Sequence, residues 1–292
     1  MNNKIKTVGI VSPSFFIEKE DQYEKGISYL KALGLKLKFG VCSGKKYFNT
    51  TGTPQERAYE INQMFADNQV DAIFASDGGC RAIEVLEYLD YKLIQSHPKP
   101  FCGFSDITHI LLALYAKTNN VSIHGMDVLN GFGLNGSFSF KANEELFWDT
   151  LNNVNCYIDL QGAKVLKKGE GEGIAIGGWI NAIQQLVNTE YFPRLPKMVL
   201  FWEAVDEEPN RINMMLHSLR LSGLFSNLSG MVIGELYNCD EKEYYDCIPR
   251  IEDIILDACV GYDFPILINA PFGHGENKRV FKYGTVIKIS EN

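Results

Sequence analysis

The 292-residue sequence lacks any long apolar run: none reaches the roughly 18 residues that a membrane-spanning helix requires, and no signal-peptide-like stretch follows the basic start Met1–Thr7. It also lacks a cluster of lysine or arginine residues, and its net charge is −8. Nucleic-acid backbones and anionic membranes are bound mainly through clustered positive charge. We therefore predict a cytoplasmic protein that binds neither nucleic acid nor membrane.

Signatures of cofactor binding are also missing. The seven cysteines are an odd number without a C-x-x-C pair, which favours reduced thiols over a disulfide framework. The metal-site spacings H-x-x-x-H and H-E-x-x-H are absent. Gly78-Gly79 resembles a phosphate cradle but lacks the third glycine of a dinucleotide fingerprint and the lysine of a P-loop. We interpret it as a turn that offers backbone amides to a ligand, and we predict no metal and no other cofactor.

Short apolar runs alternate with helical patterns through the first half of the chain. Pro54 stands at a first helical position, after Thr53 as N-cap and with Glu56 in the first turn. Such alternation predicts β-α-β units and a mainly parallel sheet, with a ligand site at the carboxyl ends of its strands. The expected strands are residues 8–11, 35–39, 72–75, 100–104 and 121–124, and the expected helices are residues 22–33, 54–67, 81–88 and 107–118.

This regularity weakens between residues 131 and 172, where the glycine-rich segment Lys167–Gly173 is interpreted as a turn-rich joint. We place a domain boundary near residues 160–170. The elements expected around and beyond it are helices near residues 143–151, 209–221 and 244–258, and strands at residues 198–202, 231–234 and 266–269.

Gly103-Phe104-Ser105-Asp106 comes directly after an apolar strand and directly before a helix. This is the setting of a nucleophile elbow, in which a sharp turn exposes a serine and the next amide points to where an oxyanion forms. Ile107 replaces the last glycine of the full G-x-S-x-G pattern. The alternative is that Ser105 caps the helix by accepting a hydrogen bond from the amide of Ile107 or Thr108.

A serine nucleophile needs a base, and the sequence offers five histidines. His97 lies in a polar loop, His109 lies one turn into the following helix, and His217 lies in an amphipathic helix. His124 ends a predicted strand and could border the same cleft. His274 lies between glycines that permit close approach of another segment, which makes it a credible base.

A third group should be a carboxylate that orients the histidine. Glu203 ends an apolar strand, where an acid is unusual unless it is used or paired. Asp206, Glu207 and Glu208 follow it, and they also fit a solvated loop and the acidic first turn of a helix.

Several of these segments occur, in order, in one known family. Pro98–Thr108 carries the most specific match, to the pattern nPKp…GySDiT, and the resemblance covers nearly the whole chain. The chain resembles the L,D-carboxypeptidase family, which includes the microcin C self-immunity peptidases. The other matching segments are Gly9–Ser14, Thr53–Ala58, Met64–Asp67, Asp77–Arg81, Leu89–Tyr91, His124-Gly125, Gly177-Gly178, Thr189–Tyr191, Leu200–Glu203 and Gly273-His274.

The resemblance implies a Ser-His-Glu peptidase with Ser105 as nucleophile, His274 as general base and acid, and Glu203 orienting His274. It implies an oxyanion hole made by the backbone amides of Gly79 and Asp106. The implied fold is α/β, with a Rossmann-like N-terminal domain and parallel sheet over residues 1–165, and a smaller, mostly β C-terminal domain over residues 166–292. It also implies a homodimer.

Four residues depart from the family pattern: Cys80, Met126 (usually proline), Trp179 (in place of an asparagine) and Met214 (in place of an arginine). They lie outside the implied triad and bear on substrate specificity. The sequence identifies no substrate-binding residue.

The resemblance implies a substrate that is a small peptide or a peptidyl-nucleotide. The first expectation is release of terminal D-alanine from murein tetrapeptide. The alternative is a microcin-type immunity peptidase that cleaves an acyl-nucleotide amide, with Trp179 stacking on the base. A third interpretation is a non-catalytic binding protein, against which the intact Ser105, Glu203 and His274 speak.

Overall fold

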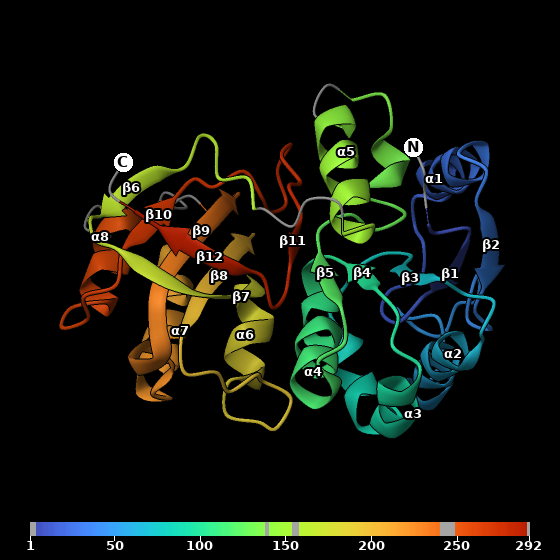
Figure 1. Ribbon diagram of the computed structural model, residues 1–292, viewed down its shortest axis with the longest axis horizontal. Helices are drawn as coiled ribbons and strands as arrows, with labels where there is room; N and C mark the ends of the chain where they lie inside the picture. Colours follow the sequence, from blue (N-terminus) through green and yellow to red (C-terminus); the bar gives the residue numbers. More distant parts are fainter. Residues whose placement is uncertain (1–3, 138–139, 154–157, 240–248, 291–292) are drawn as a thin grey trace.

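The computed structural model describes residues 4–137, 140–153, 158–239 and 249–290. The N-terminal half, blue to green in Figure 1, and the C-terminal half, yellow to red, lie side by side. Each half is built on a six-stranded sheet. The two-domain α/β fold expected from the sequence is confirmed.

The first sheet has the order β11-β5-β4-β3-β1-β2, and all its neighbours are parallel except β11 and β5. Helices α1 and α5 pack on one face and α2, α3 and α4 on the other. The bounds are β1 (Thr7–Val11), α1 (Glu20–Ala32), β2 (Lys36–Phe39), α2 (Pro54–Ala66), β3 (Ala72–Ala75), η1 (Ala82–Tyr88), α3 (Tyr91–Ser96), β4 (Phe101–Gly103), η2 (Ser105–Ile107), α4 (Thr108–Thr118), β5 (Ser122–His124), η3 (Phe132–Leu134), α5 (Phe140–Leu151) and β11 (Phe281–Lys282).

The second sheet has the order β12-β7-β8-β9-β10-β6, with a parallel centre and antiparallel strands at both edges. Its central strand β8 is almost wholly buried. The bounds are β6 (Lys164–Lys167), β7 (Gly171–Trp179), α6 (Ile180–Leu186), β8 (Met198–Val205), α7 (Pro209–Leu221), η4 (Leu224–Asn227), β9 (Leu228–Tyr237), α8 (Ile251–Ala258), β10 (Ile266–Ile268) and β12 (Val286–Ile289).

Local sequence signals account for several element ends. The side chain of Thr53 accepts a hydrogen bond from the Glu56 amide, and Glu56 accepts one from the Thr53 amide, so the capping box at the start of α2 is present. The predicted segment 81–88 is a 3₁₀ helix rather than an α-helix, and β-branched Ile83 and Val85 lower its α-helical propensity. The part of the helix predicted over 244–258 that precedes residue 249 lies outside the described residues.

The predicted turn-rich joint over Lys167–Gly173 is wrong in its second part, where β7 begins at Gly171. The glycine serves close packing rather than a turn, because a Cβ on Gly171 would lie 1.7 Å from the carbonyl oxygen of Ser229. Strand β8 likewise continues to Val205, so Glu203 lies inside the strand and not at its end.

The two halves are joined by more than their packed surfaces. Strand β11, late in the chain, pairs with β5 of the first sheet, as Figure 1 shows between the two halves. Gly178 on β7 approaches the first half so closely that a Cβ there would lie 2.5 Å from Thr108 Oγ1 and 2.8 Å from His124 Cδ2. The domain division at residue 165 stays a prediction, and β11 crosses it.

Within the described residues, no helix is both long and apolar enough to cross a membrane.

The buried ring of Phe281 provides a test of this junction. It stacks on Phe201 of the second sheet and on His124 of the first. We expect Phe281→Ala to lower the free energy of unfolding by about 3–5 kcal/mol, because it leaves a cavity between the halves. Urea denaturation measures this, and Val286→Ala, at a 64% exposed position of β12, is the matched control with a change below about 0.5 kcal/mol. Equal losses in the two variants would contradict the role of Phe281.

Candidate active site

Ser105 lies at the carboxyl end of β4, on the tight turn that enters η2. Its backbone is left-handed, with φ of 59°, a conformation that a residue other than glycine adopts only under local constraint. The first turns of η2 and α4 carry no side-chain capping bond. The interpretation of Ser105 as a helix cap is therefore not supported, and its hydroxyl is directed elsewhere.

His274 connects that hydroxyl to a buried carboxylate. Its Nε2 lies 2.8 Å from Ser105 Oγ, and its Nδ1 lies 2.6 Å from Glu203 Oε2. Glu203 is fully buried on β8, whereas the side chain of His274 is 16% exposed. A carboxylate only accepts hydrogen bonds, so the ring proton is held on Nδ1 and Nε2 is left to accept from the serine hydroxyl.

The other histidines lie in different environments. His97 bonds to the Leu93 carbonyl, and His217 bonds to the Asn213 carbonyl within α7. His109 is buried, with Nε2 2.6 Å from Gln185 Oε1.

His124 is buried among aromatic rings, and neither ring nitrogen has a partner within the described structure. Burial lowers its pKa to about 3, helped by the charges of His274 and Lys278. It is a neutral packing residue beside the site.

Asp206 and Glu207, which follow Glu203, bond to asparagines in the described structure. Asp206 pairs with Asn238, and Glu207 accepts a bond of 2.6 Å from Asn181 Nδ2. Glu208 immediately precedes α7. Of the four candidates, only Glu203 is placed against the histidine.

The Gly78-Gly79 turn lies against Ser105. A Cβ on Gly78 would lie 3.4 Å from Ser105 Oγ. Gly79 has φ of 144°, and a Cβ there would lie 2.4 Å from Ser14 Oγ, so only glycine fits. The contact of Gly78 brings the glycine turn next to the hydroxyl, where an amide donor to an oxyanion is required.

The side chain of Asp106 fixes this turn relative to the serine. Its Oδ2 accepts bonds of 2.5 Å from Ser14 Oγ and 2.8 Å from the Ala82 amide, and Ser14 Oγ in turn accepts from the Arg81 amide. Its Oδ1 lies 3.0 Å from His109 Nδ1. Burial raises the pKa of Asp106, but the hydrogen bond and charge of His109 outweigh it, so the pKa is lowered.

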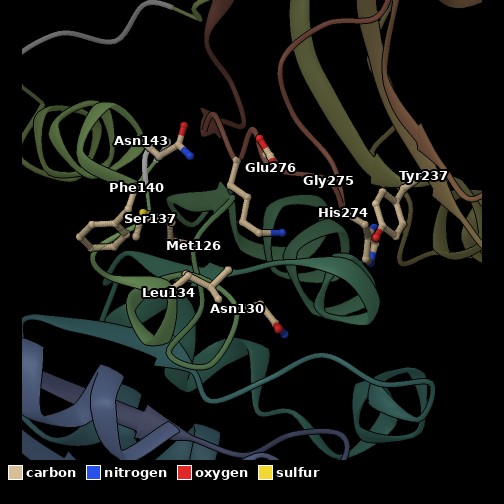
Figure 2. A pocket seen from close by; sticks show the side chains of 12 residues that line it. Met126, Asn130, Leu134, Ser137, Phe140, Asn143, Tyr237, His274, Gly275 and Glu276 are labelled. Atoms are coloured by element: carbon tan, nitrogen blue, oxygen red, sulfur yellow. The ribbon is translucent and has the colours of Figure 1, made fainter. Parts of the chain in front are cut away.

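A cavity of about 310 Å³ opens beside His274. Figure 2 shows His274 and Tyr237 on one side of it, Ser137, Phe140 and Asn143 on the other, and Asn130 and Leu134 below. Its size is at the lower end of small-molecule pockets. The cavity can therefore receive a peptide end or a group of similar size next to the histidine.

Two acids, the buried Asp127 and the half-buried Asp77, both bond to Asn130 in the wall of this cavity. Asn130 donates from its side chain to Asp77 Oδ1 at 2.8 Å and from its amide to Asp127 Oδ1 at 2.5 Å. Burial, together with the charge of Asp77, raises the pKa of Asp127 to about 8. Asp77 also accepts from the Gly78 amide at 2.7 Å, so this pair is linked to the glycine turn.

The four departures from the family pattern lie in different places. Met126 is buried and lines the cavity, whereas Met214 is 64% exposed on α7 and does not. Cys80 is exposed next to Gly79. Trp179 precedes α6, and its amide donates to Thr108 Oγ1 at 3.1 Å.

Sequence reasoning missed residues that act behind the three central side chains. Ser14 and the Asp106 carboxylate support the glycine turn, and Glu235 on β9 accepts from Asn277 in the loop that carries His274. Asp106 stood in the most specific motif and could have been singled out, but the partners of Ser14 and Glu235 lie far away in sequence. Within the described residues, no group of three potential metal ligands is present.

Comparison with known proteins matches this chain to the models of one family. Residues 8–125 match the model of the LD-carboxypeptidase N-terminal domain, and residues 172–289 match that of its C-terminal domain.

Two relatives are similar over most of both chains. A probable murein peptide carboxypeptidase of Bacillus subtilis is 27% identical, over 93% of this chain and 85% of its own length. The microcin C7 self-immunity protein MccF of Escherichia coli is 26% identical, over 97% and 89%. A solved structure of MccF in complex with glutamyl sulfamoyl guanosine has the same fold, with a TM-score of 0.88 and 22% identity over 98% of this chain and 93% of that one.

His124 gives a pH-dependent test of this description. Below its ordinary pKa of about 6.5 the unfolded histidine takes up a proton, whereas the folded one does not until about pH 3. The unfolded state then binds more protons, so acidification from pH 6.5 towards 3 lowers stability. We expect His124→Phe to gain about 2 kcal/mol relative to the parent between pH 7.5 and 5, measured by urea denaturation. If the free energy of unfolding changed with pH in the same way for both proteins, His124 would take up its proton in the folded state over the same pH range as in the unfolded state.

Proposed function

The chain belongs to the LD-carboxypeptidase family, and from this premise we propose that it is a serine carboxypeptidase with the triad Ser105, His274 and Glu203. The observation that carries the proposal is the position of His274, within 2.8 Å of a serine hydroxyl and 2.6 Å of a buried carboxylate. Nucleophile, base and orienting acid are the minimum set for acyl transfer by serine.

In the first step, His274 Nε2 accepts the proton of Ser105 as Oγ attacks the scissile carbonyl carbon. Glu203 stabilises the imidazolium that forms. The developing oxyanion accepts hydrogen bonds from the amides of Gly79 and Asp106, which the Ser14–Asp106 bond holds together.

In the second step, the C–N bond breaks and the imidazolium donates its proton to the departing amine. Water then enters, His274 removes one of its protons, and the hydroxide equivalent attacks the acyl-Ser105 ester. The ester bond breaks and the proton returns to Ser105 Oγ, which restores the free enzyme.

For the substrate we propose murein tetrapeptide, from which the enzyme releases the terminal D-alanine. The name of the Bacillus subtilis relative supports a murein peptide. The cavity beside His274, of about 310 Å³, is of a size that suits a chain end. Release of a terminal residue needs room for only one residue beyond the scissile bond.

A second candidate substrate is an acyl-nucleotide amide of the microcin type. The similarity to MccF, and the aromatic side chains of Phe140 and Tyr237 in the cavity wall, favour it. Trp179, which we first considered for stacking on a base, is not among the residues that line the cavity.

The homodimer, which the family resemblance implies, and the cytoplasmic location, which the sequence predicts, remain proposals. All three triad residues come from one chain, so the proposed chemistry does not require a partner subunit.

Triad variants test the function directly. Murein tetrapeptide is incubated with each protein, and released D-alanine is followed by mass spectrometry. We expect Ser105→Ala to lower kcat by about 10⁴–10⁶-fold and Glu203→Gln by about 10⁴-fold, because the first removes the nucleophile and the second misorients the base.

His97→Gln is the matched control, because His97 lies in another part of the fold, and it should keep parental kcat. Turnover of aminoacyl sulfamoyl adenosine but not of tetrapeptide would favour the second candidate. If both triad variants kept parental activity, the mechanism would be contradicted.

A further inference from the structure

Lys278 is a buried cation in the wall of the cavity beside His274. It is 9% exposed and lies on the segment between β10 and β11, four residues after the histidine. Burying an ammonium group costs several kcal/mol unless an opposite charge and hydrogen bonds compensate it. Its partners therefore need to be identified.

The contacts of this ammonium group are few and weak. Its Nζ lies 3.5 Å from the Gly273 carbonyl oxygen and 4.5 Å from the centroid of the Phe104 ring. An ammonium group has three protons to donate, so most of its bonding capacity is unused. The Phe104 ring lies 4.4 Å from the His274 ring, centroid to centroid, and Gly273 immediately precedes His274, so the charge lies close to the catalytic base.

Three acids contribute to the electrostatic environment of Lys278, but each has a nearer partner. Glu203 bonds to His274, Asp127 accepts from the Asn130 amide, and Glu235 accepts from Asn277. In the described structure none of them forms an ion pair with Lys278. Burial lowers the pKa of Lys278, and the opposing effect of these three acids is smaller. The neighbouring cation Arg279 is already paired with Asp159.

We propose that Lys278 binds the terminal carboxylate of the substrate and so makes the enzyme specific for chain ends. The proposal rests on the carboxypeptidase function proposed above. An anionic group in the cavity would supply the missing partner of the ammonium, and a charge pair in a place of low dielectric is strong when both groups are desolvated.

Bond lengths support this placement. In a C-terminal residue only the amide nitrogen and Cα separate the scissile carbonyl carbon from the carboxylate carbon. A cation that binds the carboxylate must therefore lie close to the nucleophile and the base, as Lys278 does through Phe104 and Gly273. Glu276, which also lines the cavity, is exposed, so solvent screens its repulsion of an anion.

The test compares two probes, murein tetrapeptide with its free terminal carboxylate and the same peptide as its C-terminal carboxamide. We expect the parent to favour the free acid by about 100-fold in kcat/KM, as expected when one partner of a buried charge pair is removed. Lys278→Met, of similar length without the charge, should lose about 100-fold on the acid and much less on the amide. The ratio of kcat/KM for the acid to kcat/KM for the amide then falls to near one.

Lys288→Met is the matched control, because Lys288 is an exposed lysine on β12, and it should keep the parental preference. An equal loss on both probes in Lys278→Met would mean that Lys278 only supports the His274 loop, and it would overturn the proposal. So would a parent that hydrolyses both probes with the same kcat/KM.

Binding separates this proposal from the proposed function. In the Ser105→Ala background, calorimetry with the same two peptides reads carboxylate recognition without turnover. Tight binding of the free acid by Ser105→Ala, lost in Ser105→Ala/Lys278→Met, supports the role of Lys278. If the parent hydrolyses neither peptide, that failure rejects only the proposed catalytic function. Equal affinities for acid and amide would overturn the role of Lys278.

Discussion

The hydrogen bonds of His274 impose the main constraint on this fold, because they join side chains from two different sheets. Ser105 follows β4 of the first sheet, and Glu203 lies on β8 of the second. Hydrogen bonds of this kind weaken steeply when a distance or an angle changes. The chemistry proposed here therefore requires that the two halves of the chain be held at a fixed separation.

Several features meet that requirement. Strand β11 leaves the second half and pairs with β5, and Gly178 lets the backbone of β7 approach the first half. Behind the serine, the buried guanidinium of Arg57 donates to the carbonyl groups of Pro13 and Arg81. These bonds hold Pro13, which precedes Ser14, and Arg81, which follows the glycine turn, on one buried side chain.

Whether a buried group at this site is charged or neutral depends on whether it has a partner of opposite charge. His109 is fully buried but paired with Asp106, and its pKa is raised because that pairing outweighs burial. His124 is equally buried without a partner and stays neutral. Lys278 lies between these cases, since it is buried and has acids near it but none paired with it. Where a buried charge lacks a partner within the protein, the substrate is the natural candidate to provide one.

Much of the first half could be predicted from the sequence, because its signals are local. Thr53 and Glu56 mark a helix start, and the strand before Ser105 leads into a helix. The choice of His274 over His124 could not be made locally, because His124 ends a strand and His274 follows one, and only the packing of the two sheets distinguishes them. Strand β7 was missed because glycine in a sequence signals a turn, whereas Gly171 is needed there for close approach to Ser229. The family resemblance, not spacing, brought Glu203 and His274 together before the structure did.

The central claim is that His274 activates Ser105 as a nucleophile. Labelling with a fluorophosphonate, followed by peptide mass spectrometry, tests it most directly, because such reagents react with an activated serine. We predict a single adduct on the peptide that contains Ser105, formed at least about 100-fold more slowly in His274→Ala. An adduct on another serine, or equal labelling of Ser105 without His274, would contradict it.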